Sequence, residues 1–152
     1  MQKFSLLEMN QMTSFSSEYE LLDPLIDFLR GSKRLSDDSD CIAEFYWGGR
    51  RIDFVTLTSS GRSTAYELKL SDNFRAVEQA AYNKFAFDRS YVVTATYPSE
   101  GVSEFASACG VGIIHISPRK VTICRNSCLK VPESLMRKKV SSSIRKNSLE
   151  HV

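Results

Sequence analysis

Between residues 50 and 70, in the middle of the chain, apolar and polar positions follow the pattern of β-strands. This stretch contains two strand-like runs joined by a Ser-Ser-Gly turn, with Asp53 on the first run and Glu67 and Lys69 on the second. Side chains of a strand alternate between its two faces, so residues two apart point the same way. The pattern therefore predicts a hairpin in which Glu67 and Lys69 share one face.

The turn decides where Asp53 lies. A three-residue Ser-Ser-Gly loop needs a residue in the left-handed conformation, and Gly61 is at that position. Such a loop pairs Thr58 with Arg62 and sets Asp53 opposite Glu67, whereas a shift of one residue would turn Asp53 to the other face. We favour the first register, which gathers two carboxylates and an ammonium group on one face.

Upstream of the hairpin, the sequence predicts a helix and one further strand. Apolar residues recur at helical spacing after Ser17, which forms a capping box with Glu20, and Gly31 ends this helix. Residues 41–47 read as a strand, and the Gly-Gly pair that follows is a strong hairpin turn. Residues 1–16 show no clear period and are expected to form a loose N-terminal arm.

Downstream of the hairpin, helices and strands alternate. The expected elements are a helix over 71–88 capped by Ser71 or Asp72, a strand over 90–96, a helix over 101–109 opened by Pro98 and Ser99, a strand over 111–117 and a short edge strand over 121–124. The first helix should bury Phe74, Val77, Ala81 and Phe85. Right-handed crossovers would stack these helices on the sheet. We expect an α/β fold with a mixed central sheet flanked by helices, in the order helix, antiparallel strands, helix, strand, helix, strand.

The charge of the chain is uneven. The net charge is +2, but residues 119–152 contain nine Lys or Arg residues, Lys138 among them, and two Glu, which leaves +7 in that segment. Clustered cations release counterions from a phosphate backbone, so the basic end favours a polyanion as partner. A solvated, frayed terminus is the alternative interpretation.

With 152 residues, the chain has the size of one domain and the composition of an ordinary globular protein. We expect this domain over 17–125, then a basic tail over 126–152 with a short helix over 132–139 and disorder from Ser141. No membrane span or signal peptide is visible, so we expect a cytoplasmic protein with no membrane partner. The cysteine spacing argues against a zinc site, and His115 reads as a core or edge residue.

Two carboxylates and an ammonium group on one sheet face are costly unless something holds them together. Paired carboxylates repel each other, and a divalent cation is the usual remedy. Oxygen-only ligands suit a hard ion such as Mg²⁺. Lys69 would then orient or activate an attacking water. A merely solvated face is the alternative, because Glu-x-Lys is common on strands.

Asp53, followed by Glu67-x-Lys69 on the next strand, resembles the motif of the PD-(D/E)XK nuclease superfamily. The resemblance covers residues 17–117 and rests on element order and chemistry. It implies a restriction-endonuclease-like core, DNA as partner and hydrolysis of phosphodiester bonds with Mg²⁺ or Mn²⁺. Asp53, Glu67 and the backbone carbonyl of Leu68 would bind the metal, and Lys69 would position water or offset developing charge.

The resemblance also implies a third acid. In members similar to Holliday-junction resolvases, a glutamate near the start of the first helix reaches the metal, and Glu18 is at that position. Glu20 competes for this role, and Glu44 on the preceding strand could supply a ligand in its place. Both helix acids would also complement the helix dipole.

A polar line runs along the helix predicted after Glu-x-Lys, formed by Arg75, Gln79 and Tyr82. Several branches of the superfamily place a glutamine and a tyrosine on this helix, where they brace the site or contact DNA. The resemblance implies a catalytic role for Gln79 more directly than for Tyr82. In the exonuclease-like branch the tyrosine follows the glutamine by four residues, whereas Tyr82 follows Gln79 by three and the fourth position holds Asn83. The expected nucleic-acid contacts are Arg50, Arg51, Arg75, Tyr82 and Lys138.

These observations lead to one main hypothesis and two alternatives. The main hypothesis is a magnesium-dependent deoxyribonuclease, an endonuclease or exonuclease of DNA repair, recombination or defence. One alternative is a nucleic-acid-binding or assembly module on the same fold, with idle catalytic groups. The other is the nuclease subunit of a larger complex. A homodimer is a further possible assembly. Retention of both acids and the lysine favours an enzyme.

Overall fold

A computed structural model of the chain describes residues 15–71 and 73–150, which fold around one six-stranded sheet. The strands lie side by side in chain order: β1 (Asp40–Trp47), β2 (Arg50–Leu57), β3 (Ser63–Lys69), β4 (Arg89–Thr94), β5 (Gly112–Ile116) and β6 (Val121–Arg125). The pairs β3–β4 and β4–β5 are parallel, and the other neighbours are antiparallel. The predicted α/β fold with a mixed sheet is confirmed.

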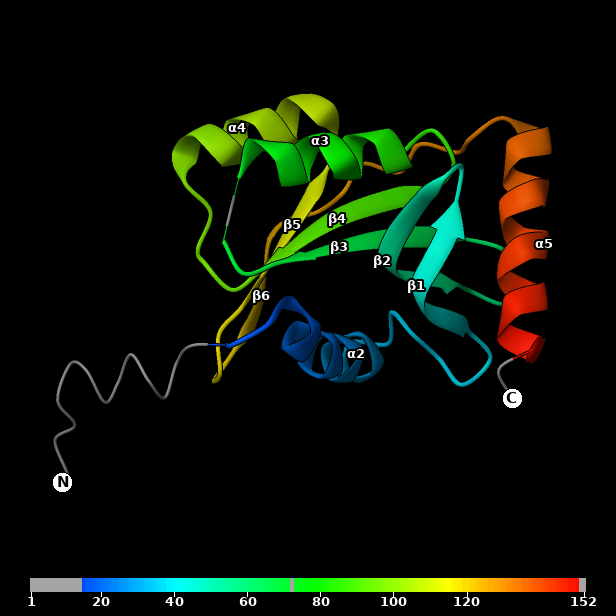
Figure 1. Cartoon of the computed structure of the whole chain (residues 1–152), viewed down its shortest axis with the longest axis horizontal. Coiled ribbons are helices and arrows are strands. Elements are labelled where there is room, and N and C mark those ends of the chain that lie inside the picture. The colour runs from blue at the N-terminus through cyan, green and yellow to red at the C-terminus, as the bar shows by residue number, and fades with distance from the viewer. Residues whose placement is uncertain (1–14, 72, 151–152) are drawn as a thin grey trace, which may run out of the picture.

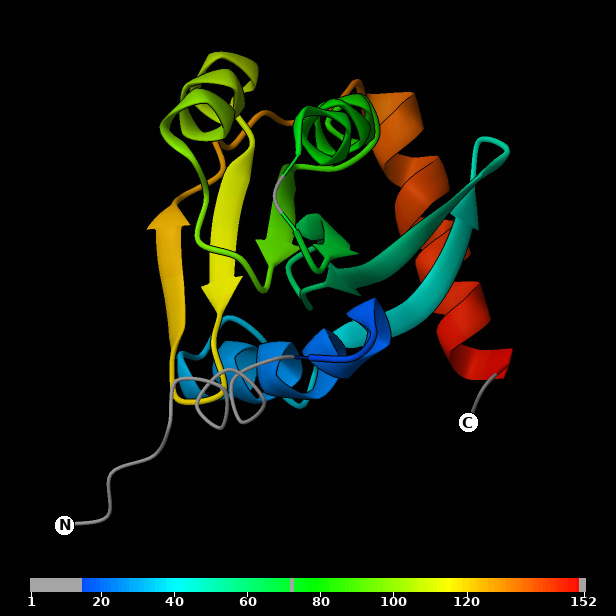
Figure 2. The ribbon, with the colours of Figure 1, turned by 60° about the vertical axis from the view of Figure 1, so that its left-hand side comes forward.

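Helices cover both faces of the sheet and pack beside its first strand (Figures 1 and 2). Helices α3 (Phe74–Asn83) and α4 (Glu100–Cys109) lie on one face, and η1 (Glu18–Leu21) and α2 (Leu22–Gly31) lie on the other. Helix α5 (Ser134–Glu150) runs alongside β1. Three apolar clusters fill these interfaces, one under α2, one under α3 and α4, and one beside α5.

The β2–β3 hairpin has the predicted register. The Thr58 N–H donates to the Arg62 carbonyl at 2.9 Å, and Gly61 has a φ of +90° in the loop. Further along, Phe54 pairs with Tyr66. The same register, extended by one residue, places Asp53 opposite Glu67.

The two parallel strand pairs are connected through α3 and α4, as the alternation of elements predicted. The cap of α3 is Asn73, whose side chain accepts the Ala76 N–H at 2.6 Å. The expectation of Ser71 was therefore wrong, because Asn73 is closer to the first turn; Asp72 lies outside the described residues. The Ser99 hydroxyl caps α4 as predicted.

The first helical segment begins differently from the predicted capping box. Ser17 precedes η1 but makes no side-chain capping bond. The Glu20 carboxylate instead accepts both the backbone N–H, at 2.8 Å, and the hydroxyl of Ser16. The first turn is a 3₁₀ turn, so the glutamate reaches one residue further back than the motif predicts. Pro24 lies in the first turn of α2, where it is tolerated, and Gly31 ends the helix as expected.

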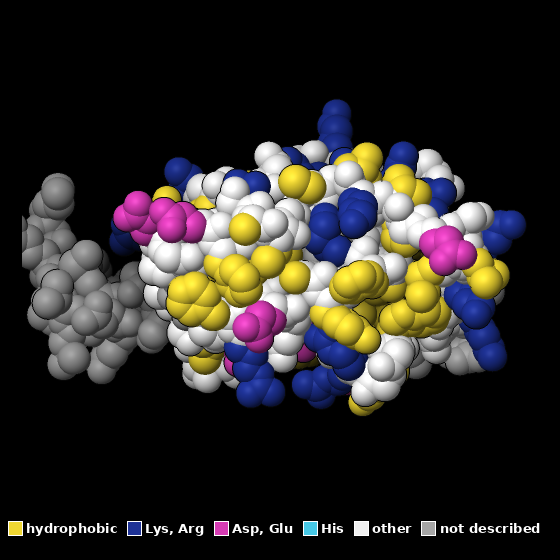
Figure 3. Space-filling model, turned by 90° about the horizontal axis from the view of Figure 1, so that it is seen from above, with side chains coloured by type: hydrophobic (Ala, Val, Ile, Leu, Met, Phe, Trp, Pro, Cys, Tyr) yellow, Lys and Arg dark blue, Asp and Glu magenta, His cyan; other side chains and the backbone are white. Residues whose placement is uncertain are grey.

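The buried face of α3 is also shifted. Phe74 and Phe85 were expected inside, but they are 54% and 74% exposed. The helix ends at Asn83, so Phe85 follows it and no longer continues its apolar stripe. The buried residues of α3 are Ala76, Val77, Ala80 and Asn83. Hydrophobic side chains consequently remain on the surface that includes α3 and α4 (Figure 3).

The C-terminal segment is a structural part of the fold. One helix, α5, replaces both the short helix expected over 132–139 and the disorder expected from Ser141, so these two predictions were wrong. Val140 and Ile144 are buried against the apolar residues of β1 and β2. The serine-rich sequence did not indicate this role, because only a few apolar side chains of α5 are needed to pack the helix against β1 and β2.

Charged groups reinforce the attachment of α5. The Arg137 guanidinium donates to the Gly61 carbonyl at 2.9 Å, and its Nε is 3.5 Å from the Asp88 carboxylate, which is fully buried. Asp88 also accepts the backbone N–H of Ser63 at 2.8 Å. Helix α5 therefore contacts the hairpin loop as well as β1, and it is linked to the start of β3 through Asp88.

Candidate active site

Asp53 lies where the sheet opens. Strand β2 pairs with β3 only as far as Phe54 and Tyr66, although β2 itself continues back to Arg50. The Asp53 carboxylate accepts the backbone N–H of Leu68 at 2.8 Å. Asp53 is therefore held at the fork between the two strands, where its carboxylate takes the place of a backbone acceptor.

Glu67, on the opposite side of this fork, is almost completely buried, with 4% of its side chain exposed. Its Oε1 accepts the side-chain amide of Asn83 at 2.9 Å. The Arg50 guanidinium approaches the same oxygen to 3.8 Å. A buried carboxylate needs such partners, because an unpaired buried charge is strongly destabilising.

These partners do not fully compensate the Glu67 carboxylate for its loss of hydration. The pKa of Glu67 is raised from its usual 4.5 to about 7, mainly because the carboxyl group is buried and in smaller part because of the negative charge of Asp53. The hydrogen bond from Asn83 and the charge of Arg50 act in the opposite direction. The two carboxylates therefore interact electrostatically, and the neutral form of Glu67 is favoured more than in an exposed glutamate.

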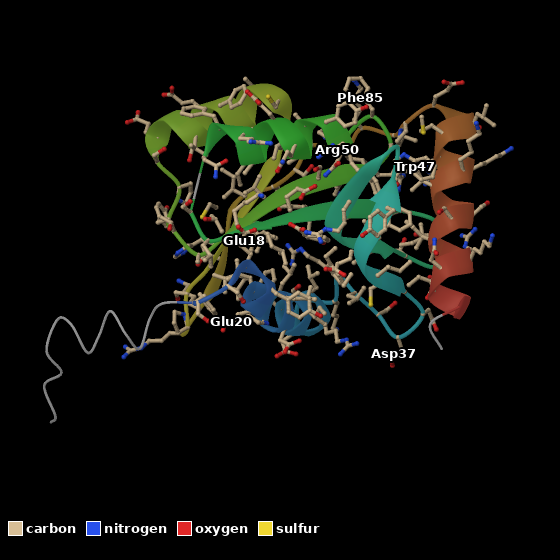
Figure 4. The ribbon with its side chains drawn as sticks, in the orientation of Figure 1. Glu18, Glu20, Asp37, Trp47, Arg50 and Phe85 are labelled. Carbon is tan, nitrogen blue, oxygen red and sulfur yellow. The ribbon has the colours of Figure 1, made fainter. Side chains whose placement is uncertain are left out.

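Lys69 lies two residues after Glu67 and faces an acid from the other side of the sheet. Its Nζ is 3.9 Å from Oε2 of Glu18, and the two side chains are 26% and 48% exposed. Glu18 belongs to η1 and lies on the sheet side of that turn, whereas Glu20 points away (Figure 4). Of the two helix acids, Glu18 is the one beside the predicted site.

Glu44 lies on β1 and lines the same small cavity as Asp53. It has a φ of +56°, a left-handed conformation that is strained for a residue with a side chain. Glu44 forms an exposed ion pair with Arg51 at 3.5 Å. A cavity of about 140 Å³ connects this pair with the site; it is lined by Glu18, Tyr19, Glu44, Arg51, Asp53 and Leu68.

Arg50 bridges the acids and the end of α3. Its guanidinium donates to the side-chain carbonyl of Asn83 at 3.2 Å and lies 4.9 Å from the centre of the Tyr82 ring. Figure 4 shows Arg50 near Phe85 and on the opposite side of the sheet from Glu18. Its position against Glu67 makes Arg50 part of the site itself, as well as a candidate phosphate contact.

Asn83 is the site residue to which the sequence analysis assigned no role. It is 3% exposed and binds both Glu67 and Arg50. A polar residue on an otherwise apolar helix face can be recognised in a sequence as a candidate site residue. Recognising Asn83 in this way requires a correct prediction of which face of α3 is buried. The prediction that α3 buries Phe85 misplaced this face.

The remaining predicted residues are less closely associated with the acids. Gln79 is one helical turn before Asn83, and its side-chain oxygen is buried without a hydrogen-bond partner in the described structure. Arg75 is exposed on α3, and Lys138 is exposed on α5. The structure thus places Arg50 against Glu67 and Glu18 against Lys69, with Asp53 at the fork between the strands, but it does not bring Arg75 or Lys138 into contact with these acids.

The residues present fit a hard divalent cation as a two-carboxylate site. Within 15–71 and 73–150, no group of three or more His, Cys, Asp and Glu side chains has the arrangement of a metal site. Asp53 and Glu67 still provide the one or two carboxylates that Mg²⁺ commonly takes when substrate phosphates and water complete its shell. The pKa of Glu67 is raised mainly by burial and also by the charge of Asp53, and a bound cation would offset both effects by stabilising the ionised carboxylate.

The histidine and cysteines have other surroundings. His115 Nε2 donates to the Ala95 carbonyl at 3.2 Å, and its ring packs edge-on against Tyr97, which agrees with a structural role. The four thiols are free, and burial raises the pKa of Cys41 and Cys124. In the part of the chain that is described, no helix has the length and apolar character needed to cross a membrane.

Comparisons with known proteins support the fold of this chain but do not indicate its function. No family model and no curated protein matches the chain. Among solved structures, the SPO1766 protein of unknown function from Silicibacter pomeroyi is 17% identical with a TM-score of 0.60, over 81% of this chain and 80% of that one. SfsA from Pyrococcus furiosus, solved in complex with Ca²⁺, is 11% identical with a TM-score of 0.41, over 74% and 65% respectively. The first likeness shows a shared fold, and the second is too distant to carry an argument.

Proposed function

We propose that this protein is a metal-dependent phosphodiesterase that cleaves DNA, with an active site of the PD-(D/E)XK kind. The observation that carries the proposal is the placement of Asp53 opposite Glu67 at the fork of β2 and β3, with Lys69 two residues further along β3. A buried carboxylate whose pKa is raised to about 7, next to a second carboxylate, is typical of functional sites.

Each residue has a role that follows from its contacts. Asp53, Glu67 and the Leu68 carbonyl would hold Mg²⁺ or Mn²⁺, which supplies positive charge to the scissile phosphate and acidifies water. The Lys69 ammonium orients the attacking water or offsets the charge that develops on the phosphate, and Glu18 holds this ammonium in place. Asn83 and Arg50 position the Glu67 carboxylate.

The test is cleavage of single-stranded, duplex and branched DNA with Mg²⁺ or Mn²⁺. We expect cleavage by the wild-type protein and a loss of about a hundredfold or more in Asp53→Asn and Glu67→Gln, the scale of lost transition-state stabilisation. Glu104→Gln, which changes an exposed carboxylate on α4, is the matched control and should cleave normally. Full cleavage by Asp53→Asn would reject the proposed site.

A second function is favoured by the charge pairing in the site. Glu67 is paired with Arg50, and Glu18 with Lys69, so the acids have protein partners. This arrangement also suits a nucleic-acid-binding or assembly module with idle catalytic groups, acting alone or in a larger complex. Tight DNA binding by the wild-type protein, with no cleavage of any of the three substrates in either metal, would favour this second function.

A further inference from the structure

An aromatic pocket adjoins the candidate site on its α3 side. It has a volume of about 350 Å³ and lies between the end of α3, the β1–β2 turn and the start of α5. Most of its wall is apolar. The side chains that form it include Trp47, Arg50, Tyr82, Asn83, Phe85 and Met136.

The rings at this pocket are unusually exposed. Tyr82 is 58% exposed and Phe85 is 74% exposed, and the two rings meet edge to face with centroids 5.9 Å apart. Trp47 lies at the end of β1, stacked on Phe45 at 6.3 Å. Figure 3 shows hydrophobic side chains gathered on this surface beside Lys and Arg side chains. Clustered exposed rings of this kind mark a binding surface.

Two residues connect the pocket with the acids. Arg50 lines the pocket, lies 4.9 Å from the Tyr82 ring and reaches to 3.8 Å from Glu67. Asn83 also lines the pocket and donates to Glu67 at 2.9 Å. A ligand in the pocket would therefore have its polar end next to a guanidinium and the carboxylate pair, and its apolar part among the rings.

These features identify the chemistry of the occupant. A nucleotide has a flat base, which stacks on aromatic rings whichever of the four bases it is, and a phosphate, for which an arginine is a natural partner. The pocket is at the small end of ligand pockets, which suits one base and not a large molecule. Bases inside a duplex are already stacked on each other, so the base must come from an unpaired nucleotide.

We propose that this pocket binds one base of a single-stranded nucleic-acid segment, while the attached phosphate passes Arg50 toward Asp53 and Glu67. The inference rests on the proposed function for the identity of the reaction, and it specifies the substrate as single-stranded or locally unpaired DNA. Base binding itself requires neither the metal nor cleavage, so it can be tested separately.

Trp47 provides the probe, because it is the single tryptophan of the chain. The intact protein is titrated in EDTA with a short oligothymidine strand, with an abasic strand of equal length and with a blunt duplex, while tryptophan emission is recorded. We expect saturable quenching by oligothymidine and at least about tenfold weaker binding of the abasic strand, which keeps the phosphates but has no bases. The duplex should bind without changing the emission.

The matched variants are Phe85→Ala and Phe74→Ala. Both remove an exposed phenyl ring, but Phe74 is at the other end of α3 and packs on Phe105. Phe85→Ala should weaken oligothymidine binding about tenfold and leave the affinity for the abasic strand unchanged. Phe74→Ala should stay within about twofold of wild type for both strands. Circular dichroism establishes that each variant is folded.

Three results would overturn the inference. The first is equal affinity for oligothymidine and the abasic strand, and the second is unchanged base-dependent binding in Phe85→Ala. The third is self-association that light scattering detects in the wild type but not in Phe85→Ala, because this result would assign the pocket to a second copy of the chain. The proposed function fails differently. Base-dependent binding without cleavage would reject the nuclease and retain the pocket, whereas cleavage with no base dependence would reject the pocket alone.

Discussion

Glu67 is the residue where burial and charge are most directly opposed. Its carboxylate is removed from water, is near the charge of Asp53, and is only partly compensated by Asn83 and Arg50. A pKa of about 7 in the folded state, against 4.5 for an exposed glutamate, means that the folded protein binds more protons than the unfolded chain between these two values. Its stability should therefore decrease as the pH rises through this window.

Glu67→Gln should remove this pH dependence. The glutamine keeps the shape of the side chain and carries no charge, so the variant should be more stable than wild type at pH 8, by on the order of 3 kcal/mol, and nearly equal to it at pH 5. Urea unfolding at both pH values measures the difference. Glu104→Gln, an exposed carboxylate, should unfold with the wild-type pH dependence. If the free energy of unfolding decreased equally with pH in the wild type and in Glu67→Gln, Glu67 would not be the group responsible for the pH dependence.

Lys69→Met separates a catalytic lysine from a structural one. Methionine retains most of the apolar stem but has no ammonium, so stability should change by no more than about 0.5 kcal/mol. Cleavage should decrease by roughly a hundredfold or more with DNA affinity nearly unchanged, because the lost interaction is one of the transition state. Single-turnover cleavage and binding assays measure the two effects. Lys120→Met, at an exposed lysine between β5 and β6, is the control; equal cleavage by both variants would mean that Lys69 has no catalytic role.

The hairpin and α5 differ in how locally their structures are determined. Gly61 and its three-residue loop set the register of β2 and β3 over a few residues, so the position of Asp53 follows from nearby sequence. Helix α5 instead depends on Val140 and Ile144 and on the contact of Arg137 with buried Asp88. Those partners are far away in sequence, and the helix has little apolar surface of its own.

Ile144→Ala tests whether α5 is part of the folded core. Ile144 is fully buried, so its truncation should destabilise the protein by about 2 to 4 kcal/mol through lost burial and a residual cavity. Leu135→Ala, on the same helix but 57% exposed, should cost less than about 0.5 kcal/mol. Denaturant unfolding of the two variants gives both values. Equal, small effects would show α5 to be detached, as a disordered tail would be.

At the scale of the whole molecule, the basic C-terminal segment becomes one charged surface. Lys138, Arg145 and Lys146 are exposed on α5, which packs beside β1 and is connected to the hairpin loop through Arg137. Deleting this segment would expose the core under α5, so it cannot report on charge alone. Substituting the exposed cations tests their role without removing the helix.

The variant with Lys138, Arg145 and Lys146 all changed to Gln should bind single-stranded DNA less tightly and with a weaker salt dependence. If each cation neutralises one phosphate, the slope of log affinity against log salt should become shallower by about 2. Fluorescence titrations between low and moderate salt measure this slope. A control with Arg30, Arg119 and Lys120 changed to Gln removes three exposed cations from other surfaces. An unchanged slope in the α5 variant would show that the helix does not contact the strand.

The sequence predicted what depends on short-range geometry. Strand alternation and the loop around Gly61 placed Asp53 opposite Glu67, and the alternation of helices and strands predicted the parallel crossovers of β3, β4 and β5. The errors occurred where several local solutions have similar energies. Asn73 replaced Ser71 as a cap, Glu20 reached Ser16 instead of Ser17, and α3 ended before Phe85.

By itself, the sequence determined the pair of acids and the fold class, because turn geometry and side-chain alternation act between neighbours in the chain. Only the tertiary structure decided which groups surround that pair. It placed Asn83 and Arg50 on Glu67, chose Glu18 over Glu20 beside Lys69, and left Tyr82 and Phe85 exposed next to the site. These contacts join residues from different elements, so they depend on how the helices pack on the sheet and on which carboxylate the packing buries.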